Sequence, residues 1–314
     1  MLMGILGGPT AIGKSAIGLK LCAQNGFALI AADSRQLYAE LNIGTGAPTA
    51  QERAQVRHFL VNELPLGEAY SPLRFREDVL RILSSLGDTP SFIVGGTGLY
   101  LRELLFPTKS NVVNAPPDIA AAAQAKLDND GAKALHAELT RLDPSSMSHV
   151  HVNDHFRLRK RLEHWMMTGE GYLERAPEPQ RDPRFADVPL LLLDRPREEL
   201  HDLIANRVKA MAKAGWPVEA QLLFARHMPD TLGLNAIGYT EMADVASGKL
   251  SIDEAIRHVI ARTNQYAKRQ STFFRHQFPD AEKWDATEFH QALLSVDFDW
   301  QRFRASRRKT LNER

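Results

Sequence analysis

Short apolar runs alternate with longer segments of helical periodicity along much of the chain. Four runs have the length of a strand and few polar side chains, at residues 2–6, 27–32, 91–94 and 188–193. Strands that are apolar on both faces are typical of a parallel sheet with helices packed on each side. The pattern therefore predicts an α/β protein with a parallel sheet and flanking helices.

The stretch between the third and fourth apolar runs has helical character and no strand-like run. Three segments there have helical periodicity, at 119–127, 132–142 and 153–167. Three further helical segments follow the fourth run, at 197–213, 218–226 and 252–274. We therefore expect a helical insertion domain over residues 110–185, and a core domain with C-terminal helices made of residues 1–109 and 186–314.

A phosphate-binding motif follows the first apolar run. The sequence GPTAIGKS at residues 8–15 matches G-x-x-x-x-G-K-[ST] between a strand-like run and a helical segment, as the motif requires. In such a P-loop, main-chain N–H groups and the start of the helix surround phosphate oxygens, and the lysine adds a positive charge. The candidate phosphate-binding residues are Gly8, Pro9, Thr10, Ala11, Ile12, Gly13, Lys14 and Ser15. The hydroxyl of Ser15 is a candidate ligand for Mg²⁺.

Asp33 is the carboxylate that the second apolar run brings to the same edge of the sheet. P-loop hydrolases usually carry an acid after a second strand, but the run at 91–94 continues into Gly95, Gly96 and Thr97. Asp33 could be a metal ligand, a general base or a helix N-cap, because ADSRQLY also matches a cap followed by a helical turn. The local sequence leaves these three roles open.

Four segments together resemble one family of proteins. They are GPTAIGKS at 8–15, ADSRQLYAELNIGTGAP at 32–48, GGTGLYLREL at 95–104 and TNQYAKRQSTFFR at 263–275. The weaker segments VNDHFRLRKRLE at 152–163 and IGYTEM at 237–242 extend the similarity over nearly the whole chain. The chain thus resembles the tRNA dimethylallyltransferases, also called tRNA isopentenyltransferases, of the bacterial type.

The resemblance implies a reaction and residues that perform it. This family transfers a dimethylallyl group from dimethylallyl pyrophosphate to N6 of the adenine 3′ of the anticodon in tRNA, and releases pyrophosphate. By this resemblance, Asp33 is the catalytic base for the adenine amino group. Thr10, Lys14 and Ser15 would contact the pyrophosphate, and Arg207 would stabilise its charge as it leaves. Mg²⁺ is the expected cofactor.

Two groups of tRNA-binding residues are also expected. By resemblance, those beside the adenine are Asp33, Ser34, Arg35, Gln36 and Thr97, since amide and hydroxyl groups suit the hydrogen-bonding edge of an extruded base. Those in the insertion are Arg157, Arg159, Lys160 and Arg161. Helical periodicity predicts a basic face that includes Arg157, Lys160 and Arg161. The alternative is a solvated helix with a supporting ion pair between Arg159 and Glu163.

Two other functions are compatible with a P-loop. In a small-molecule kinase, Arg157 and Arg161 would cover ATP, and the phosphate loop would serve phosphoryl transfer. In a non-catalytic RNA-binding module, the loop would sense a nucleotide. A kinase would leave the motifs at 32–48 and 263–275 without a role.

Composition limits the remaining possibilities. The chain has 314 residues and a formal net charge of +1, so a nucleic-acid partner must rest on local clusters of charge. The single cysteine, Cys22, excludes an internal disulfide, and His149, His151 and His155 match no recognised zinc spacing. No apolar run approaches the roughly 18 residues that cross a bilayer. We expect a cytoplasmic monomer that binds tRNA and dimethylallyl pyrophosphate, without a membrane or an obligate protein partner.

Overall fold

A computed structural model of the protein describes residues 1–107, 115–148, 150–172, 180–295 and 298–305. The chain divides into two compact units. One combines Met1–Leu105 with Pro183–Arg314, and the other is Phe106–Asp182. The insertion expected at 110–185 corresponds to the second unit, with boundaries a few residues away.

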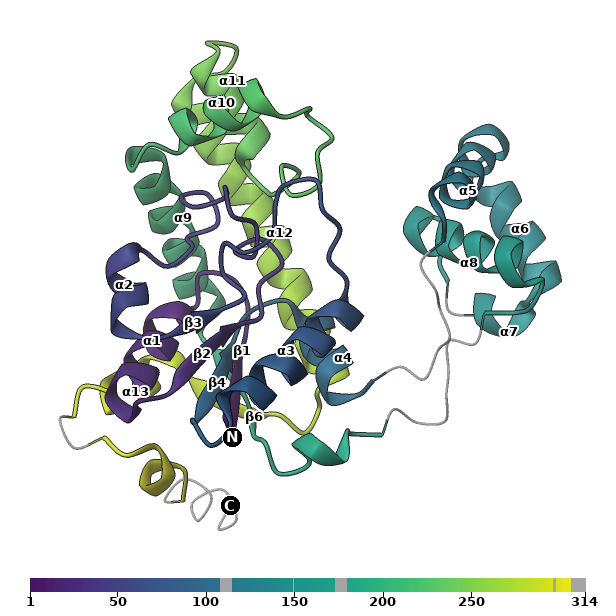
Figure 1. Ribbon diagram of the computed structural model, residues 1–314. Coiled ribbons are helices and arrows are strands. Elements are labelled where there is room, and N and C mark those ends of the chain that lie inside the picture. The colour runs from purple at the N-terminus through teal and green to yellow at the C-terminus, as the bar shows by residue number, and fades with distance from the viewer. Residues whose placement is uncertain (108–114, 149, 173–179, 296–297, 306–314) are drawn as a thin grey trace. The chain divides into compact units, whose positions relative to one another are not determined.

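The first unit is built on a six-stranded sheet (Figure 1). Its strands are β1 (Leu2–Gly7), β2 (Ala28–Ala31), β3 (His58–Phe59), β4 (Ser91–Val94), β5 (Leu190–Asp194) and β6 (Glu282–Asp285). They are arranged in the order β3-β2-β4-β1-β5-β6, and every neighbouring pair is parallel. The predicted α/β class with a parallel sheet is confirmed.

Strand β1 lies inside the sheet between β4 and β5. Ile5 is opposite Ile93 on one side and Leu190 on the other. Gly4 makes room for a core ring, because a Cβ there would lie 2.5 Å from the Phe92 side chain. In open α/β sheets, ligands bind beyond the carboxyl ends of the strands. We therefore expect a ligand-binding site at the loops after β1, β2 and β4.

Both edge strands lacked a recognisable apolar pattern. β3 has two half-buried residues, and β6 carries Glu282, Lys283 and Asp285 around one buried residue, Trp284. Short and charged strands are common at sheet edges because only one neighbour pairs with them. Hydrophobic periodicity therefore predicted the four inner strands and missed the two at the edges.

Helices cover both faces of the sheet (Figure 1). One face carries α1 (Lys14–Asn25) and α13 (Ala286–Ala292), and the other carries α3 (Pro72–Leu86) and α4 (Gly98–Leu105). The short helix α2 (Ala50–Gln55) follows the loop at 42–48. Gln24 of α1 donates a hydrogen bond to the Leu293 carbonyl just after α13, at 3.1 Å. Gly18 lets α1 approach the sheet, since a Cβ there would lie 2.7 Å from Val94.

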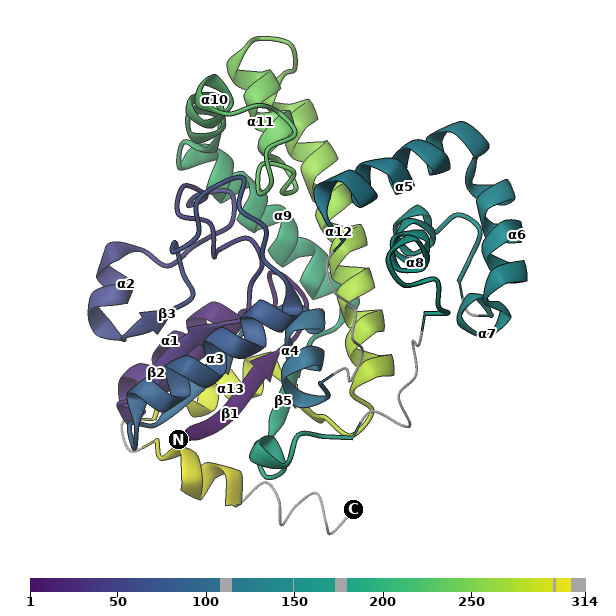
Figure 2. The same ribbon diagram turned by 45° about the vertical axis from the view of Figure 1, so that its right-hand side comes forward.

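Further helices of this unit are α9 (Arg197–Lys213), α10 (Trp216–Arg226), α11 (Tyr239–Ala246) and α12 (Ile252–Gln277), with a 3-10 turn, η1 (Pro183–Phe185). Helix α12 begins with a capping box formed by Ser251 and Glu254. Figures 1 and 2 show α12 extending from the α10–α11 pair to α4. Its buried residues include one polar side chain, Gln270, between Ala267 and Phe274. Helix α12 therefore carries an amide into the interior of the unit.

The second unit has its own hydrophobic core. Its helices are α5 (Pro117–Asp130), α6 (Ala132–Leu142), α7 (Pro144–Met147) and α8 (His155–Thr168). They bury Ala123, Leu127, Leu135, Leu139, Met147, Val150, Leu158 and Leu162 against one another. In the described parts of both units, no helix is long and apolar enough to span a bilayer.

Candidate active site

The phosphate loop has the main-chain geometry of an anion site. Ala11 has a φ of 63° and Gly13 a φ of 104°, so left-handed residues recur along the loop. Such an alternation directs successive N–H groups toward a common point. Gly13 precedes α1 and offers no side chain to cap it, which leaves the first N–H groups of the helix for a ligand.

Lys14 turns back onto its own loop. Its Nζ donates a hydrogen bond to the Pro9 carbonyl at 2.6 Å. Burial lowers the pKa of Lys14 to about 7, while the Asp33 carboxylate acts to raise it and Arg207 to lower it. These mutual effects require the three charged groups to lie close together. A bound anion would favour the protonated form of Lys14.

Asp33 follows β2 and caps the turn after it. Its Oδ1 accepts the main-chain N–H groups of Arg35 at 2.8 Å and of Gln36 at 3.2 Å. The capping role is therefore real, although residues 34–37 form a turn and not a helix. Within the part of the chain that the structure describes, Oδ2 has no such bond. A carboxylate held by one oxygen and open at the other has the arrangement of a general base.

The glycine-rich loop after β4 lies directly against the segment that carries Asp33. A Cβ on Gly95 would lie 2.1 Å from the Ala32 carbonyl oxygen, so a larger residue does not fit. The N–H of Thr97 donates to the same carbonyl at 3.1 Å, and Oγ1 of Thr97 accepts the N–H of Ser34 at 3.0 Å. Ser34 and Thr97, both predicted to contact the base, are thus neighbours.

Arg207 reaches the same region from α9. Its Nη2 donates to the Thr45 carbonyl at 2.9 Å, and a Cβ on Gly46 would lie 2.5 Å from that nitrogen. Burial lowers the pKa of the Arg207 guanidinium, and the Asp33 carboxylate opposes this effect. Arg207 is therefore held near Asp33 although the two residues are far apart in sequence.

Arg35 and Gln36 are engaged in contacts within the protein. Nη1 of Arg35 donates to Asn235 at 2.7 Å. Gln36 is buried, and its Nε2 donates to the carbonyl groups of Thr45 at 3.3 Å and Gly46 at 2.9 Å. Gln36 therefore helps to hold the loop at 42–48. Contact of these two residues with an adenine stays a prediction.

A small open pocket lies beside the phosphate loop. Ser15 contributes to its wall, together with the apolar side chains of Leu19, Leu29, Val61 and Val94. Gln36, Glu52 and His58 add polar groups to the wall, so the pocket combines apolar and polar surface next to the phosphate loop.

Tyrosines lie close to Asp33. Tyr100 of α4 stacks on Phe75 with ring centroids 4.8 Å apart and meets Tyr70 edge-on at 5.8 Å. Burial raises the pKa of Tyr100, and the Asp33 carboxylate adds to the increase. Burial also raises the pKa of Tyr266, from α12, to about 12, again with a contribution from Asp33. Neutral phenols and a carboxylate therefore share this part of the site.

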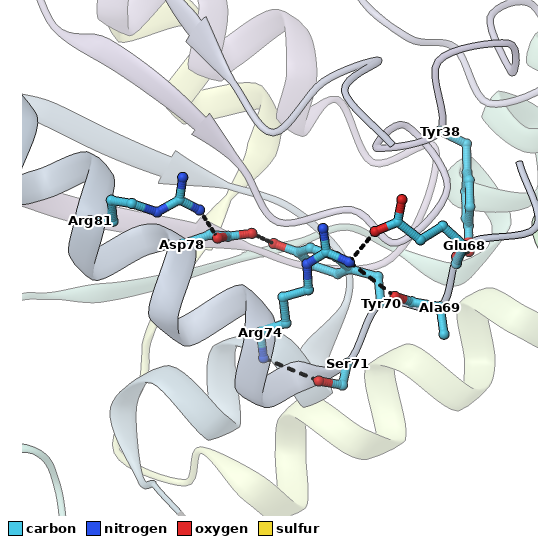
Figure 3. A network of polar contacts seen from close by, with 8 residues as sticks. All are labelled: Tyr38, Glu68, Ala69, Tyr70, Ser71, Arg74, Asp78 and Arg81. Carbon is cyan, nitrogen blue, oxygen red and sulfur yellow. Dashed lines mark hydrogen bonds and ion pairs between the residues drawn. The ribbon is translucent and has the colours of Figure 1, made fainter. Parts of the chain in front are cut away.

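The network in Figure 3 attaches the chain before α3 to that helix. The hydroxyl of Tyr70 donates to Oδ2 of Asp78 at 2.7 Å. The hydroxyl of Tyr38 donates to the Glu68 carbonyl at 3.0 Å, and the Glu68 side chain pairs with Arg74. These bonds fix the orientation of Tyr70, against which Tyr100 packs.

Two side chains that connect distant segments of this unit, Glu219 and Gln270, were not among the residues predicted from the sequence. Glu219 of α10 accepts the main-chain N–H groups of residues 42–44 and the hydroxyl of Tyr239. Gln270 of α12 connects the two glycine-rich loops. The available signal was the position of Tyr239 within IGYTEM and of Gln270 within the 263–275 segment, but neither segment shows what its side chains contact.

Three of the basic residues of the insertion lie on the accessible side of α8. Arg157 has a side chain that is 56% exposed and pairs with Asp154, the residue that caps the helix. Arg159 and Lys160 form ion pairs of 3.1 and 2.6 Å with the buried Glu163. The predicted pair between Arg159 and Glu163 is confirmed. Contact of these residues with tRNA stays a prediction.

Arg161 has a different environment. It is 4% exposed, and its guanidinium carbon lies 3.8 Å from the centre of the Tyr172 ring. The expected exposed basic face is therefore wrong for Arg161. The physical reason is that a guanidinium can be buried on an aromatic face, which simple helical periodicity does not register.

A protein metal site usually brings several side-chain ligands close together. Among the described residues, no group of three or more histidine, cysteine, aspartate or glutamate side chains is arranged to hold a metal. His149 of the histidine-rich segment lies outside the described residues. Ser15 is exposed at the start of α1 and borders the pocket. Because Mg²⁺ is often bound by few protein groups together with substrate phosphates, this hydroxyl fits such an ion.

The geometry of the core indicates what it acts on. The loop after β1 has the main-chain geometry of a phosphate site. The Asp33 carboxylate, after β2, lies close to two cationic side chains, Lys14 and Arg207. These features are those of P-loop enzymes that act on phosphorylated substrates.

Comparison with known proteins narrows this class. The sequence model of the IPP transferase family matches residues 36–277, more than half of the chain. The tRNA dimethylallyltransferase of Agrobacterium fabrum is 38% identical over 282 residues, which cover 88% of this chain and 94% of the relative. That of Gloeobacter violaceus is 35% identical over 292 residues, which cover 91% and 93%.

Solved structures agree with these relatives. The crystal structure of the full-length tRNA isopentenylpyrophosphate transferase from Bacillus halodurans has a TM-score of 0.65 at 27% identity, and the match covers 100% of this chain and 99% of that one. A eukaryotic dimethylallyltransferase acting on tRNA shares the fold, with a TM-score of 0.80 at 23% identity, over 100% and 80% of the two chains. The chain belongs to the family of tRNA dimethylallyltransferases, or IPP transferases. The predicted family and enzyme class are confirmed, and both are favoured over a kinase or a non-catalytic module.

Proposed function

We propose that this protein transfers a dimethylallyl group from dimethylallyl pyrophosphate to N6 of the adenine 3′ of the anticodon in tRNA. The observation that carries the proposal is the set of contacts around Asp33, Lys14 and Arg207. Asp33 accepts the N–H of Gln36, whose side chain shares the Thr45 carbonyl with Arg207, and a Cβ on Gly96 would lie 3.4 Å from Nζ of Lys14. A base beside two cations is what an alkyl transfer with a pyrophosphate leaving group needs.

In the proposed reaction, N6 of the adenine attacks the allylic C1 of the donor while the C1–O bond breaks. The electron pair of that bond leaves with pyrophosphate, and Asp33 accepts the proton that N6 loses. Lys14, Arg207 and the main-chain N–H groups of the phosphate loop stabilise the charge that grows on the leaving group. Electrostatic stabilisation of this kind is usually the largest contribution to catalysis.

The other parts of the site have roles in the same proposal. The apolar side chains of Leu19, Leu29, Val61 and Val94 in the pocket wall would contact the five-carbon chain. The Ser15 hydroxyl would bind Mg²⁺ together with the pyrophosphate. When bound, the ion supplies positive charge to the phosphate oxygens. Thr10 and the rest of the loop at 8–15 would contact the same group.

tRNA is the substrate of the family, and its adenine must leave the base stack to react, at a cost of a few kcal/mol. Ser34, Arg35, Gln36 and Thr97 are the proposed contacts of the extruded base. Arg157, Arg159 and Lys160 are the proposed phosphate contacts of the insertion. We further propose that the protein acts as a monomer in the cytoplasm, where tRNA is used.

A direct test incubates the protein with unmodified tRNA, Mg²⁺ and labelled dimethylallyl pyrophosphate. The wild type should transfer the label, and Asp33→Asn should be slower by about 10² to 10⁴-fold, the usual contribution of a general base. Asparagine retains an oxygen that can accept the bonds from Arg35 and Gln36, so the variant should fold and bind tRNA. Asp88→Asn, at an exposed position, is the matched control. Absence of transfer by the wild type to any adenine-bearing anticodon loop would contradict the proposal, and consumption of ATP would indicate a kinase.

A further inference from the structure

Gln270 is a polar side chain buried in the interior of the core unit, and the proposed reaction does not use it. Its Oε1 accepts the main-chain N–H of Thr10 at 2.8 Å. Its Nε2 donates to the main-chain carbonyl of Gly96 at 2.8 Å. One amide from α12 therefore joins the phosphate loop to the glycine-rich loop after β4.

The surroundings of this amide leave little freedom. A Cβ on Gly96 would lie 2.7 Å from Nε2 of Gln270, 3.2 Å from the Gly8 carbonyl oxygen and 3.4 Å from Nζ of Lys14. Gln270 thus lies at the point where both loops and the lysine approach one another. If the side chain were apolar, the N–H of Thr10 and the carbonyl of Gly96 would lose their hydrogen-bond partner.

The phosphate loop needs such a support. Ala11, directly after Thr10, has a φ of 63°, which an L-residue with a side chain adopts at a cost of about 1–2 kcal/mol. Strained residues persist where the surrounding structure fixes them. The bond from Thr10 to Gln270 fixes the residue before the strained one, so it acts on the loop conformation that presents N–H groups to phosphate.

The second bond acts on the base side of the site. Gly96 precedes Thr97, whose Oγ1 accepts the N–H of Ser34, the residue after Asp33. Through Gly96 and Thr97, Gln270 is connected to the segment that carries the proposed base, Asp33. Through Thr10, it is connected to the loop that holds the proposed leaving group.

We propose that Gln270 is a positioning residue that holds the two loops in register before substrate binds. This inference rests on the proposed function of the same site. A site that is organised in advance loses less free energy on binding, so the effect should appear first in the affinity for the pyrophosphate group.

The test measures binding of inorganic pyrophosphate with Mg²⁺ by calorimetry, without turnover. Gln270→Met keeps the length of the side chain and removes both hydrogen bonds. We expect its pyrophosphate affinity to fall about tenfold or more, because two buried polar groups lose their partner. In transfer assays, the KM for the prenyl donor should rise while tRNA affinity changes less than about twofold. Gln265→Met, at an exposed position of the same helix, should leave both affinities at the wild-type level.

A second variant and an amide-exchange measurement test the same two hydrogen bonds of Gln270. Gln270→Asn retains both polar groups on a shorter side chain that cannot reach both loops, and it should weaken pyrophosphate binding in the same direction. In the wild type without ligand, the Thr10 amide hydrogen should exchange slowly with solvent. A folded Gln270 variant that binds pyrophosphate like the wild type, or a rapidly exchanging Thr10 amide, overturns the inference and leaves the proposed function standing. A wild type that neither binds pyrophosphate nor transfers label overturns both.

Discussion

Arg207 donates a hydrogen bond to the main-chain carbonyl of Thr45, with 2.9 Å between Nη2 and the oxygen. The two residues belong to different parts of the core unit, since Arg207 lies on α9 and Thr45 in the loop between β2 and α2. The same carbonyl also accepts from Nε2 of Gln36, at 3.3 Å. The guanidinium is therefore held in place by the protein before any anion binds, which is the condition for strong electrostatic catalysis.

Removal of this guanidinium should slow the transfer step. For Arg207→Met we expect a decrease in kcat of about 10² to 10³-fold, the range found when one stabilising donor is lost from an active site. Single-turnover measurement of label transfer at saturating tRNA checks this. Lys209→Met, an exposed residue on the same helix, is the control and should keep wild-type activity. An equal decrease in both variants would show that the effect does not come from the site.

Glu219 should support the loop to which Arg207 is attached. Its carboxylate accepts N–H groups of Asn42, Ile43 and Gly44 and the Tyr239 hydroxyl, at distances from 2.8 to 3.3 Å. Glu219→Gln should lower the free energy of unfolding by about 1.5–3 kcal/mol, because bonds to a charged acceptor are lost. Tyr239→Phe removes one of these bonds and should cost about 1 kcal/mol. Urea unfolding of both variants tests the order, and an effect of Tyr239→Phe as large as that of Glu219→Gln would contradict it.

The protonation state of Lys14 should make pyrophosphate binding depend on pH. Its pKa of about 7 in the free protein lies below the ordinary value of 10.5, because burial disfavours the cation. The unfolded chain then holds more protons between pH 7 and about 10.5, so this group makes stability rise with pH over that interval. Binding of pyrophosphate above pH 7 should in turn be accompanied by uptake of a proton by Lys14.

Calorimetry at pH 8 in two buffers of different ionisation enthalpy measures that uptake. Pyrophosphate and other groups also exchange protons, so the difference between the wild type and Lys14→Met gives the part that belongs to Lys14. We expect the wild type to take up more protons than the variant. Equal uptake would show that Lys14 is already charged in the free protein.

Truncation of Arg157 should affect tRNA binding, whereas truncation of Arg161 should affect the stability of the fold. Arg157→Ala should weaken tRNA binding and reduce the slope of log K against log salt by about 1, as for the loss of one phosphate contact, with little change in stability. Arg161→Ala should lower the free energy of unfolding by about 2 kcal/mol or more, because its buried contact with Tyr172 is lost. Salt titrations of tRNA binding and urea unfolding of both variants separate the two effects. A folded Arg161→Ala of unchanged stability would contradict this assignment.

Much of the core was predictable because its signals are local. The apolar runs of β1, β2, β4 and β5 each lie within a few consecutive residues, and a strand buried on both faces needs no knowledge of its partners to be recognised. β3 and β6 could not be found in this way, since an edge strand of two residues or one with alternating charge has no such pattern. The phosphate loop was predictable for the same reason as the inner strands, because its function depends on residues that are adjacent in the chain.

What the sequence by itself determined is the α/β class, the phosphate loop at 8–15, and the family, which six motifs identify. What only the tertiary structure decided is which distant groups meet: Gln270 with Thr10 across a separation of 260 residues, Arg207 with Thr45, and Arg161 with Tyr172 in place of solvent. Hydrogen bonds and ring contacts between distant residues leave no periodicity in the chain, because they depend on where the helices pack and not on the order of neighbouring side chains.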